Sequence, residues 1–146
     1  MSVEATYRHK LDAPLADAWS VVGDFGSLLK WVSGGEEGKI SLTGDGPGML
    51  RDFILPAVGA VQHRLDVLDD QQHQLTYSLT SGKPLGMVEY SVSIRLTEAG
   101  GDACTMNWSG EFTAEPDAAV EGMAQALKDA YRSMSELLNE LLKDKE

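Results

Sequence analysis

The sequence has little of several features that would place a chain outside the cell or in a membrane. It contains one cysteine, Cys104, so no disulfide can form within the chain. No apolar run approaches the roughly 20 residues that a membrane-spanning helix needs. The N-terminal residues lack the basic and apolar regions of a signal peptide. We therefore expect a cytoplasmic protein with no transmembrane segment.

Basic side chains are also scarce. The 12 lysines and arginines stand against 23 aspartates and glutamates, which gives a formal net charge of -11 at pH 7. Such a charge repels the phosphate backbone of nucleic acids and anionic membrane surfaces. Nucleic acid is therefore excluded as an expected partner.

The usual residue patterns of metal and cofactor sites are missing as well. The three histidines and the one cysteine are scattered, with no metal-ligand spacing. The glycines of Gly44-Asp45-Gly46-Pro47-Gly48 resemble a phosphate loop, but they open a strand and not the helix whose N-terminus would bind an anion. We expect no metal and no cofactor.

The apolar residues indicate one α+β domain that spans residues 1–146, a length that can bury one substantial core. Residues 3 to 11 alternate as a first strand. A helix is expected from about residue 14 to residue 22, with Asp12 as its N-cap, and a second short helix near residues 27 to 32.

The middle of the chain predicts six further strands joined by hairpins. Glycine- and proline-containing turns break it, and no helical pattern lies between the strands, so the sheet is expected to be antiparallel throughout. From about residue 116 to residue 143, apolar residues recur at helical spacing. We expect this long C-terminal helix to lie across the concave face of the seven-stranded sheet.

Alternation along the strands predicts which side chains meet that helix. The expected inner face is mostly apolar, a profile typical of a ligand pocket of roughly 300 to 1,000 Å³, although a filled core would use the same residue types. The expected inward residues are Met49, Arg51, Phe53, Leu55, Val61, His63, Leu65, Val67, Leu75, Tyr77, Leu79, Tyr90, Val92, Ile94, Leu96, Cys104, Met106, Trp108, Gly110 and Phe112.

Two inward residues, an arginine and a histidine, have basic side chains. Arg51 has no aspartate or glutamate on the predicted inner face, so either a bound anion neutralises it or it extends to water at an opening. His63 lies on the neighbouring strand, where the arginine favours its neutral form. His63 is a candidate catalytic base, or a hydrogen-bonded residue of the wall.

The order of several motifs resembles the START-like (SRPBCC) superfamily, in its polyketide cyclase/dehydrase and lipid-transport branch, whose relatives include birch-pollen-type allergens and abscisic-acid receptors. The resemblance implies a helix-grip fold with a cavity between sheet and helix. The motifs, followed by the long C-terminal helix, are Asp17-Ala18-Trp19, Gly23-Asp24-Phe25, Gly46-Pro47-Gly48-Met49-Leu50-Arg51, Arg64-Leu65-Asp66-Val67-Leu68-Asp69-Asp70, Tyr77-Ser78-Leu79, Tyr90 and Trp108-Ser109-Gly110-Glu111-Phe112.

The resemblance also implies roles for single positions. Arg51 matches the cationic residue that reaches the hormone carboxylate in abscisic-acid receptors, whereas His63 stands where relatives commonly carry glutamate. Two turns lie where those receptors carry their gate and latch, and Pro56-Ala57 alone matches the gate motif, although ordinary hairpin turns use the same residues. The candidate gate residues are Pro56, Ala57, Lys83, Pro84 and Leu85.

These patterns leave open more than one function. The first is binding or transport of a small hydrophobic molecule, with or without a carboxylate, and the second is a cyclase or dehydratase reaction in the same cavity. A third is a cleft for a partner segment. The ligand's identity and the oligomeric state are not indicated. The candidate ligand-binding residues are Arg51, Phe53, His63, Leu65, Tyr77, Leu79, Tyr90, Val92, Met106, Trp108, Met123, Leu127 and Tyr131.

Overall fold

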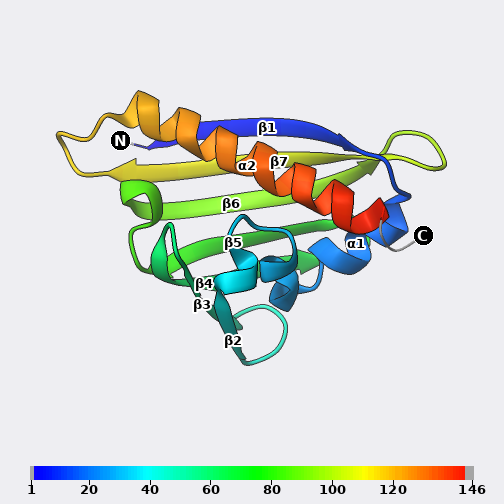
Figure 1. The fold of residues 1–146 in the computed structure, drawn as a ribbon, viewed down its shortest axis with the longest axis horizontal. Coiled ribbons are helices and arrows are strands. Elements are labelled where there is room, and N and C mark those ends of the chain that lie inside the picture. Colours follow the sequence, from blue (N-terminus) through cyan, green and yellow to red (C-terminus); the bar gives the residue numbers. More distant parts are fainter. Residues whose placement is uncertain (1, 144–146) are drawn as a thin grey trace.

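Seven strands form one curved antiparallel sheet in the computed structural model, which describes residues 2–143 (Figure 1). Their order across the sheet is β1-β7-β6-β5-β4-β3-β2, so every pair of neighbours except β1 and β7 is also consecutive in sequence. The predicted antiparallel sheet is confirmed. The strands are β1 (Val3–Leu11), β2 (Lys39–Thr43), β3 (Leu50–Leu55), β4 (Gly59–Asp69), β5 (Gln74–Ser81), β6 (Met87–Glu98) and β7 (Cys104–Ala114).

Short helices follow the first strand, as predicted. Helix α1 spans Leu15–Val22, and the next two elements are 3-10 helices, η1 (Phe25–Lys30) and η2 (Gly35–Glu37). The expected N-cap was wrong, because Pro14 occupies that position and no side chain caps the helix. The backbone N–H of Asp12 instead donates to the side chain of Asn139 at 2.8 Å, which ties the end of β1 to the C-terminal helix.

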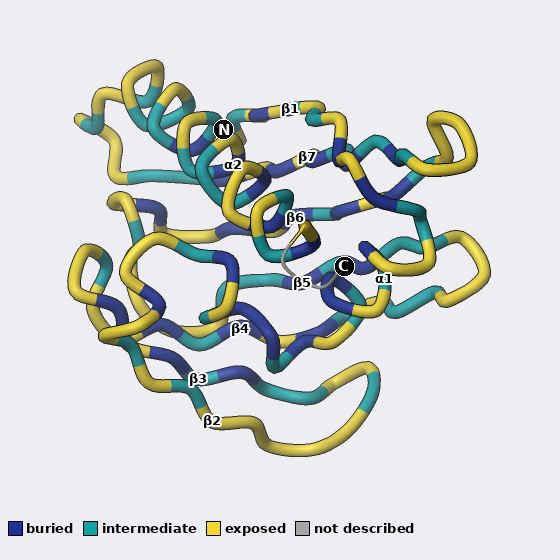
Figure 2. Tube along the Cα trace, turned by 45° about the vertical axis from the view of Figure 1, so that its right-hand side comes forward, coloured by how far each residue is buried: buried dark blue, intermediate teal, exposed yellow. Residues whose placement is uncertain are grey.

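The long helix α2 (Val120–Lys143) crosses the concave face of the sheet diagonally (Figure 1). It begins four residues later than the sequence pattern indicated, because residues 115–119 form turns. Its buried residues recur every three or four positions and so form one face toward the sheet: Leu127, Tyr131, Ser135, Leu138 and Leu142. The opposite face of α2 is exposed, as is nearly all of the edge strand β2 (Figure 2).

The predicted alternation holds along most strands but fails at Val67, a residue that is 45% exposed. The register between β4 and β5 shifts between Leu65 and Val67, so that Leu65 pairs with Tyr77 and Val67 pairs with Thr76. One extra residue in β4 turns the following side chains to the other face. Leu68, and not Val67, therefore packs against the core.

One group of side-chain contacts joins helix α2 to β7. The ring of Tyr131 stacks on that of Trp108 with centroids 4.4 Å apart, and the Trp108 indole N–H donates to Ser135 Oγ at 2.9 Å. Gly110 lies on the same strand face, where an added Cβ atom would collide with the hydroxyl oxygen of Tyr131. The absence of a side chain at Gly110 thus sets how closely the helix approaches the sheet.

This contact predicts the effect of Gly110→Ala. The added methyl group must displace the Tyr131 hydroxyl, so the free energy of unfolding should fall by about 1 to 3 kcal/mol. Chemical denaturation measures the change. In a Tyr131→Phe background the colliding oxygen is gone, and the same substitution should cost clearly less.

Gly122 provides the matched control, because an added Cβ atom there would meet no atom within 4 Å. Gly122→Ala lies in α2 and should stabilise the protein by about 0.5 to 1 kcal/mol through helix propensity alone. If both alanine substitutions change stability alike, close packing at Gly110 is not what holds α2 in place.

Candidate functional site

A cavity of about 150 Å³ lies between α2 and the inner face of the sheet. Strands β3 to β6 supply one wall, α2 supplies the other, and loop residues from η1, the β3–β4 turn and η3 (Pro84–Gly86) complete it. Apart from one histidine and three tyrosines the lining is apolar. The lining residues are Leu28, Val32, Phe53, Leu55, Val58, His63, Tyr77, Pro84, Leu85, Met87, Tyr90, Leu127, Ala130, Tyr131 and Met134.

The cavity brings together about half of the residues expected to bind a ligand. Those that line it are Phe53, His63, Tyr77, Tyr90, Leu127 and Tyr131. Four others, Leu65, Val92, Met106 and Trp108, are buried elsewhere in the core, while Leu79 and Met123 are partly buried away from the cavity wall. Of the expected gate residues, Pro84 and Leu85 line the cavity, whereas Pro56, Ala57 and Lys83 do not.

Several lining residues were not predicted as site residues. Leu55 was expected to face inward, and strand periodicity could have identified it as a site residue, as helical periodicity could have identified Met134. Leu28, Val32 and Val58 come from irregular segments, where no periodic pattern indicates which side chain points inward.

Arg51 lies next to the cavity without lining it, and its side chain is buried with the residue 3% exposed. It therefore does not extend to water. Its Nη1 donates to the carbonyl oxygen of Phe25 at 3.1 Å, and its Nη2 lies 2.8 Å from Nδ1 of His63. The strand register explains the second contact, because Arg51 and His63 are directly opposite each other on β3 and β4.

Aromatic rings take the place of a counter-ion around this guanidinium. Its central carbon lies 3.9 Å from the ring centroid of Phe25 and 4.7 Å from that of Tyr77. Within residues 2–143 no carboxylate forms an ion pair with Arg51, and its Nε is buried without a hydrogen-bond partner. Burial lowers the pKa of Arg51 to about 10, an effect that the neighbouring Tyr77 partly offsets, so the side chain is charged at neutral pH.

His63 is held between two aromatic rings, with centroids 5.0 Å from Phe53 and 4.6 Å from Tyr77. Desolvation, together with the positive charge of Arg51, lowers the pKa of His63 well below its usual value. The imidazole is therefore neutral at physiological pH, as its position beside an arginine led us to expect.

Two tyrosines from opposite walls meet in the cavity. The hydroxyl groups of Tyr90 on β6 and Tyr131 on α2 are hydrogen-bonded to each other. Desolvation raises the pKa of both phenols, that of Tyr90 well above its usual value, so neither ionises at neutral pH. The pair has two hydroxyl protons and uses one of them internally, which leaves the second for another acceptor.

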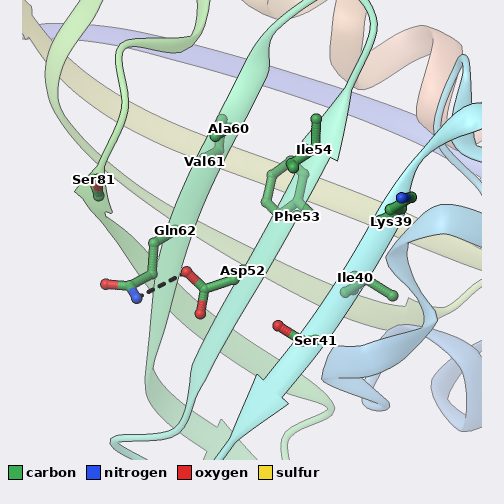
Figure 3. A pocket seen from close by; sticks show the side chains of 10 residues that line it. All are labelled: Lys39, Ile40, Ser41, Asp52, Phe53, Ile54, Ala60, Val61, Gln62 and Ser81. Carbon is green, nitrogen blue, oxygen red and sulfur yellow. Dashed lines mark hydrogen bonds between the residues drawn. The ribbon is translucent and has the colours of Figure 1, made fainter.

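A second hollow lies on the outer face of the sheet over β2, β3 and β4, with a volume of about 300 Å³ (Figure 3). Ile54 on its surface is 54% exposed, and Gln62 donates to Asp52 beside it. The titratable side chains here, Lys39 and Asp52, are not buried. This groove therefore lacks the buried polar groups that distinguish the inner cavity.

Other kinds of chemistry find little support in the described part of the chain. Cys104 is buried, and desolvation raises the pKa of its thiol to about 11, so it is not an activated nucleophile. Residues 2–143 contain no group of three metal-ligating side chains placed to hold an ion. Among those residues, no helix is both long enough and apolar enough to cross a membrane.

The environment of His63 predicts a pH-dependent stability. The pKa is lower in the folded than in the unfolded protein, so the unfolded state binds the extra proton first as pH falls below about 6.5. The free energy of unfolding should then decrease by up to about 1.4 kcal/mol per pH unit from this group. Urea denaturation from pH 7.5 to pH 5 measures the slope.

His63→Gln is the matched variant, because its amide oxygen can still accept from Arg51 but does not titrate. Its stability should fall less steeply with decreasing pH than that of the wild-type protein. Parallel pH profiles for the two proteins would show that His63 is protonated as easily in the folded state as in the unfolded one.

Comparison with known proteins agrees with this architecture. Among solved structures, the chain is similar to the protein XoxI from Bacillus cereus, with 22% identity, a TM-score of 0.82 and coverage of 97% of this chain and 96% of the other. It is also similar to norcoclaurine synthase from Thalictrum flavum in complex with dopamine and hydroxybenzaldehyde, with 17% identity, a TM-score of 0.75 and coverage of 100% and 89%. At these identities the likeness shows a shared fold.

Sequence comparison gives a more specific result. A search of curated proteins finds no match. Residues 2–143, however, match the model of the family described as polyketide cyclase/dehydrase and lipid transport, and this match spans nearly the whole chain. The chain therefore belongs to the polyketide cyclase/dehydrase and lipid transport family of the START-like (SRPBCC) superfamily, and its seven-stranded sheet around α2 is the helix-grip fold.

Proposed function

We propose that this protein binds or transports a small hydrophobic molecule in the cavity between the sheet and α2. The observation that carries the proposal is the composition of the wall, which is apolar except for His63 and three tyrosines. Ligand sites commonly combine such a lining with a few placed polar groups that fix the orientation of the guest.

The size of the cavity limits the ligand. Its volume of about 150 Å³ is below the range of roughly 300 to 1,000 Å³ that drug-sized ligands occupy. Apolar cavities of roughly 150 Å³ accept benzene. We therefore expect a guest of about one aromatic ring unless the surrounding loops move outward.

The loop at η3 is the segment best placed to make such a movement. Leu85 lines the cavity while its residue is 40% exposed, so it lies between the cavity and solvent. Its backbone φ of 56° is in the left-handed region, which costs a leucine free energy. The flanking Gly82 and Gly86 also have positive φ angles. These features support a lid at Pro84 and Leu85.

A relative of the same fold supports a ligand of this class. The norcoclaurine synthase structure holds dopamine and hydroxybenzaldehyde, and both are small aromatic molecules. The family description includes lipid transport as well as cyclase and dehydrase activity. Both descriptions are consistent with an apolar guest in a helix-grip cavity.

The alternative function is a cyclase or dehydratase reaction in the same cavity, and the observation that favours it is the group of titratable side chains at the wall. An enzyme of this kind needs one group that gives a proton and one that accepts it near neutral pH. Burial works against this division, because it raises the pKa values of Tyr90 and Tyr131 and lowers that of His63. We therefore favour binding.

Toluene is a suitable probe of the binding proposal, because it matches the size and apolarity of the cavity. Titration followed by the methyl resonances of Leu127, Met87 and Met134 should show saturable shifts at these lining residues. Ala130→Leu should fill part of the cavity and weaken toluene binding roughly ten- to a hundredfold, because overpacking costs about 1 to 3 kcal/mol.

Gln125→Leu is the control, since it adds the same side chain to the exposed face of α2. It should leave toluene affinity unchanged. The binding proposal fails if toluene shifts none of the cavity methyl groups, or if it shifts only residues of the outer groove.

A further inference from the structure

The contact between Arg51 and His63 fixes where the imidazole proton lies. All five guanidinium hydrogens of arginine are donors, and the group accepts no hydrogen bond. Nη2 of Arg51 lies 2.8 Å from Nδ1 of His63, so Nδ1 must be the acceptor and carries no proton. In a neutral imidazole the single proton is then on Nε2.

His63 has a second ring nitrogen, Nε2, which Arg51 does not occupy. His63 lines the cavity and Arg51 does not, and Nδ1 is engaged by Arg51, so Nε2 is the ring nitrogen that remains available to the cavity. Among the hydrogen bonds of residues 2–143, the side chain of His63 makes one, between Nδ1 and Arg51. The rings of Phe53 and Tyr77 flank the imidazole and limit its rotation. A donor N–H is thus left free beside an apolar space.

We propose that His63 Nε2–H recognises an oxygen atom of the ligand that accepts hydrogen bonds, and that Arg51 is a positioning residue that holds this tautomer. The proposal rests on the proposed binding function and narrows it to apolar molecules that carry a carbonyl or carboxylate oxygen. Arg51 also polarises the imidazole through Nδ1, which strengthens Nε2–H as a donor.

The same arrangement argues against His63 as a general base. A base needs a free lone pair toward the substrate, and the lone pair of Nδ1 is already used by Arg51. The buried positive charge of Arg51, which has no carboxylate partner among residues 2–143, also favours an electron-rich oxygen on the guest. The engaged lone pair of Nδ1 and the charge of Arg51 both favour a ligand oxygen that accepts a hydrogen bond, and neither helps to remove a proton from the ligand.

The tautomer can be tested without any ligand. Long-range proton–nitrogen correlation spectra of the wild-type protein at pH 7.5 distinguish a protonated from an unprotonated imidazole nitrogen. We expect His63 to show its proton on Nε2 only. In Arg51→Met the constraint on Nδ1 is lost, and the spectrum should shift toward a mixture of tautomers. A proton on Nδ1 in the wild-type protein would overturn the proposal.

Two matched probes test recognition of the oxygen. Acetophenone and α-methylstyrene have nearly the same shape, but a CH₂ group in the second replaces the carbonyl oxygen of the first. His63→Phe keeps an aromatic ring and removes the donor. It should weaken acetophenone binding roughly three- to tenfold, the range expected from the loss of one hydrogen bond, and change α-methylstyrene binding little.

Benzoate distinguishes the two sources of the acceptor oxygen. If His63→Phe weakens the binding of benzoate more than that of acetophenone, the site is suited to a carboxylate. If it weakens the binding of acetophenone more, the site is suited to a neutral carbonyl group. Calorimetric titration of all three probes against both proteins gives the comparison.

Failure of this proposal is distinguishable from failure of the binding proposal. If acetophenone and α-methylstyrene both bind the wild-type protein and His63→Phe weakens the binding of both equally, the cavity binds ligands but His63 does not recognise an oxygen atom. If neither binds although toluene does, the cavity binds an apolar ring and the inferred ligand class fails alone; if toluene does not bind either, the binding proposal fails too. Should Arg51→Met not fold, the wild-type spectrum and the His63→Phe titrations still decide the question.

Discussion

The close contact of α2 with β7 is the constraint on which the site depends. Gly110 leaves room for the Tyr131 hydroxyl, and Tyr131 stacks on Trp108 at the same point. Tyr131 is also a cavity residue, and its hydroxyl bonds to Tyr90 across the cavity. One side chain therefore both anchors the helix and lines the cavity. The cavity is consequently a product of helix docking and not of local chain geometry.

The buried Arg51 stabilises the side of the cavity that η1, β3 and β4 form. It donates to the carbonyl oxygen of Phe25 and so fixes η1 against β3, while its second terminal nitrogen holds His63 on β4. Leu28, which follows in η1, lines the cavity. Stacking on Phe25 and Tyr77 offsets part of the cost of burying a cation without a carboxylate. The β3–β4 hairpin and η1, whose Phe25 precedes Arg51 by 26 residues in the chain, are thereby brought to one side of the cavity.

Much of the fold could be predicted from the sequence, because strand alternation and helical spacing are local patterns. They predicted the antiparallel sheet, the long helix and the inward direction of Arg51 and His63. Val67 was misplaced because a β-bulge shifts the register and carries no clear residue signal. The partner of Arg51 was missed because it is a backbone carbonyl 26 residues away, and any residue type supplies one. Loop residues such as Val58 were missed because tertiary packing alone orients them.

The central claim is that the space beneath α2 is a ligand site and not an accidental packing gap. A crystal structure of the protein soaked with bromobenzene tests it most directly, since anomalous scattering locates the bromine independently of the refined protein atoms. The account predicts a single bromine position among Phe53, Tyr77 and Leu127. Bromine found only in the outer groove beside Ile54, with the inner cavity empty at saturating bromobenzene, would contradict it.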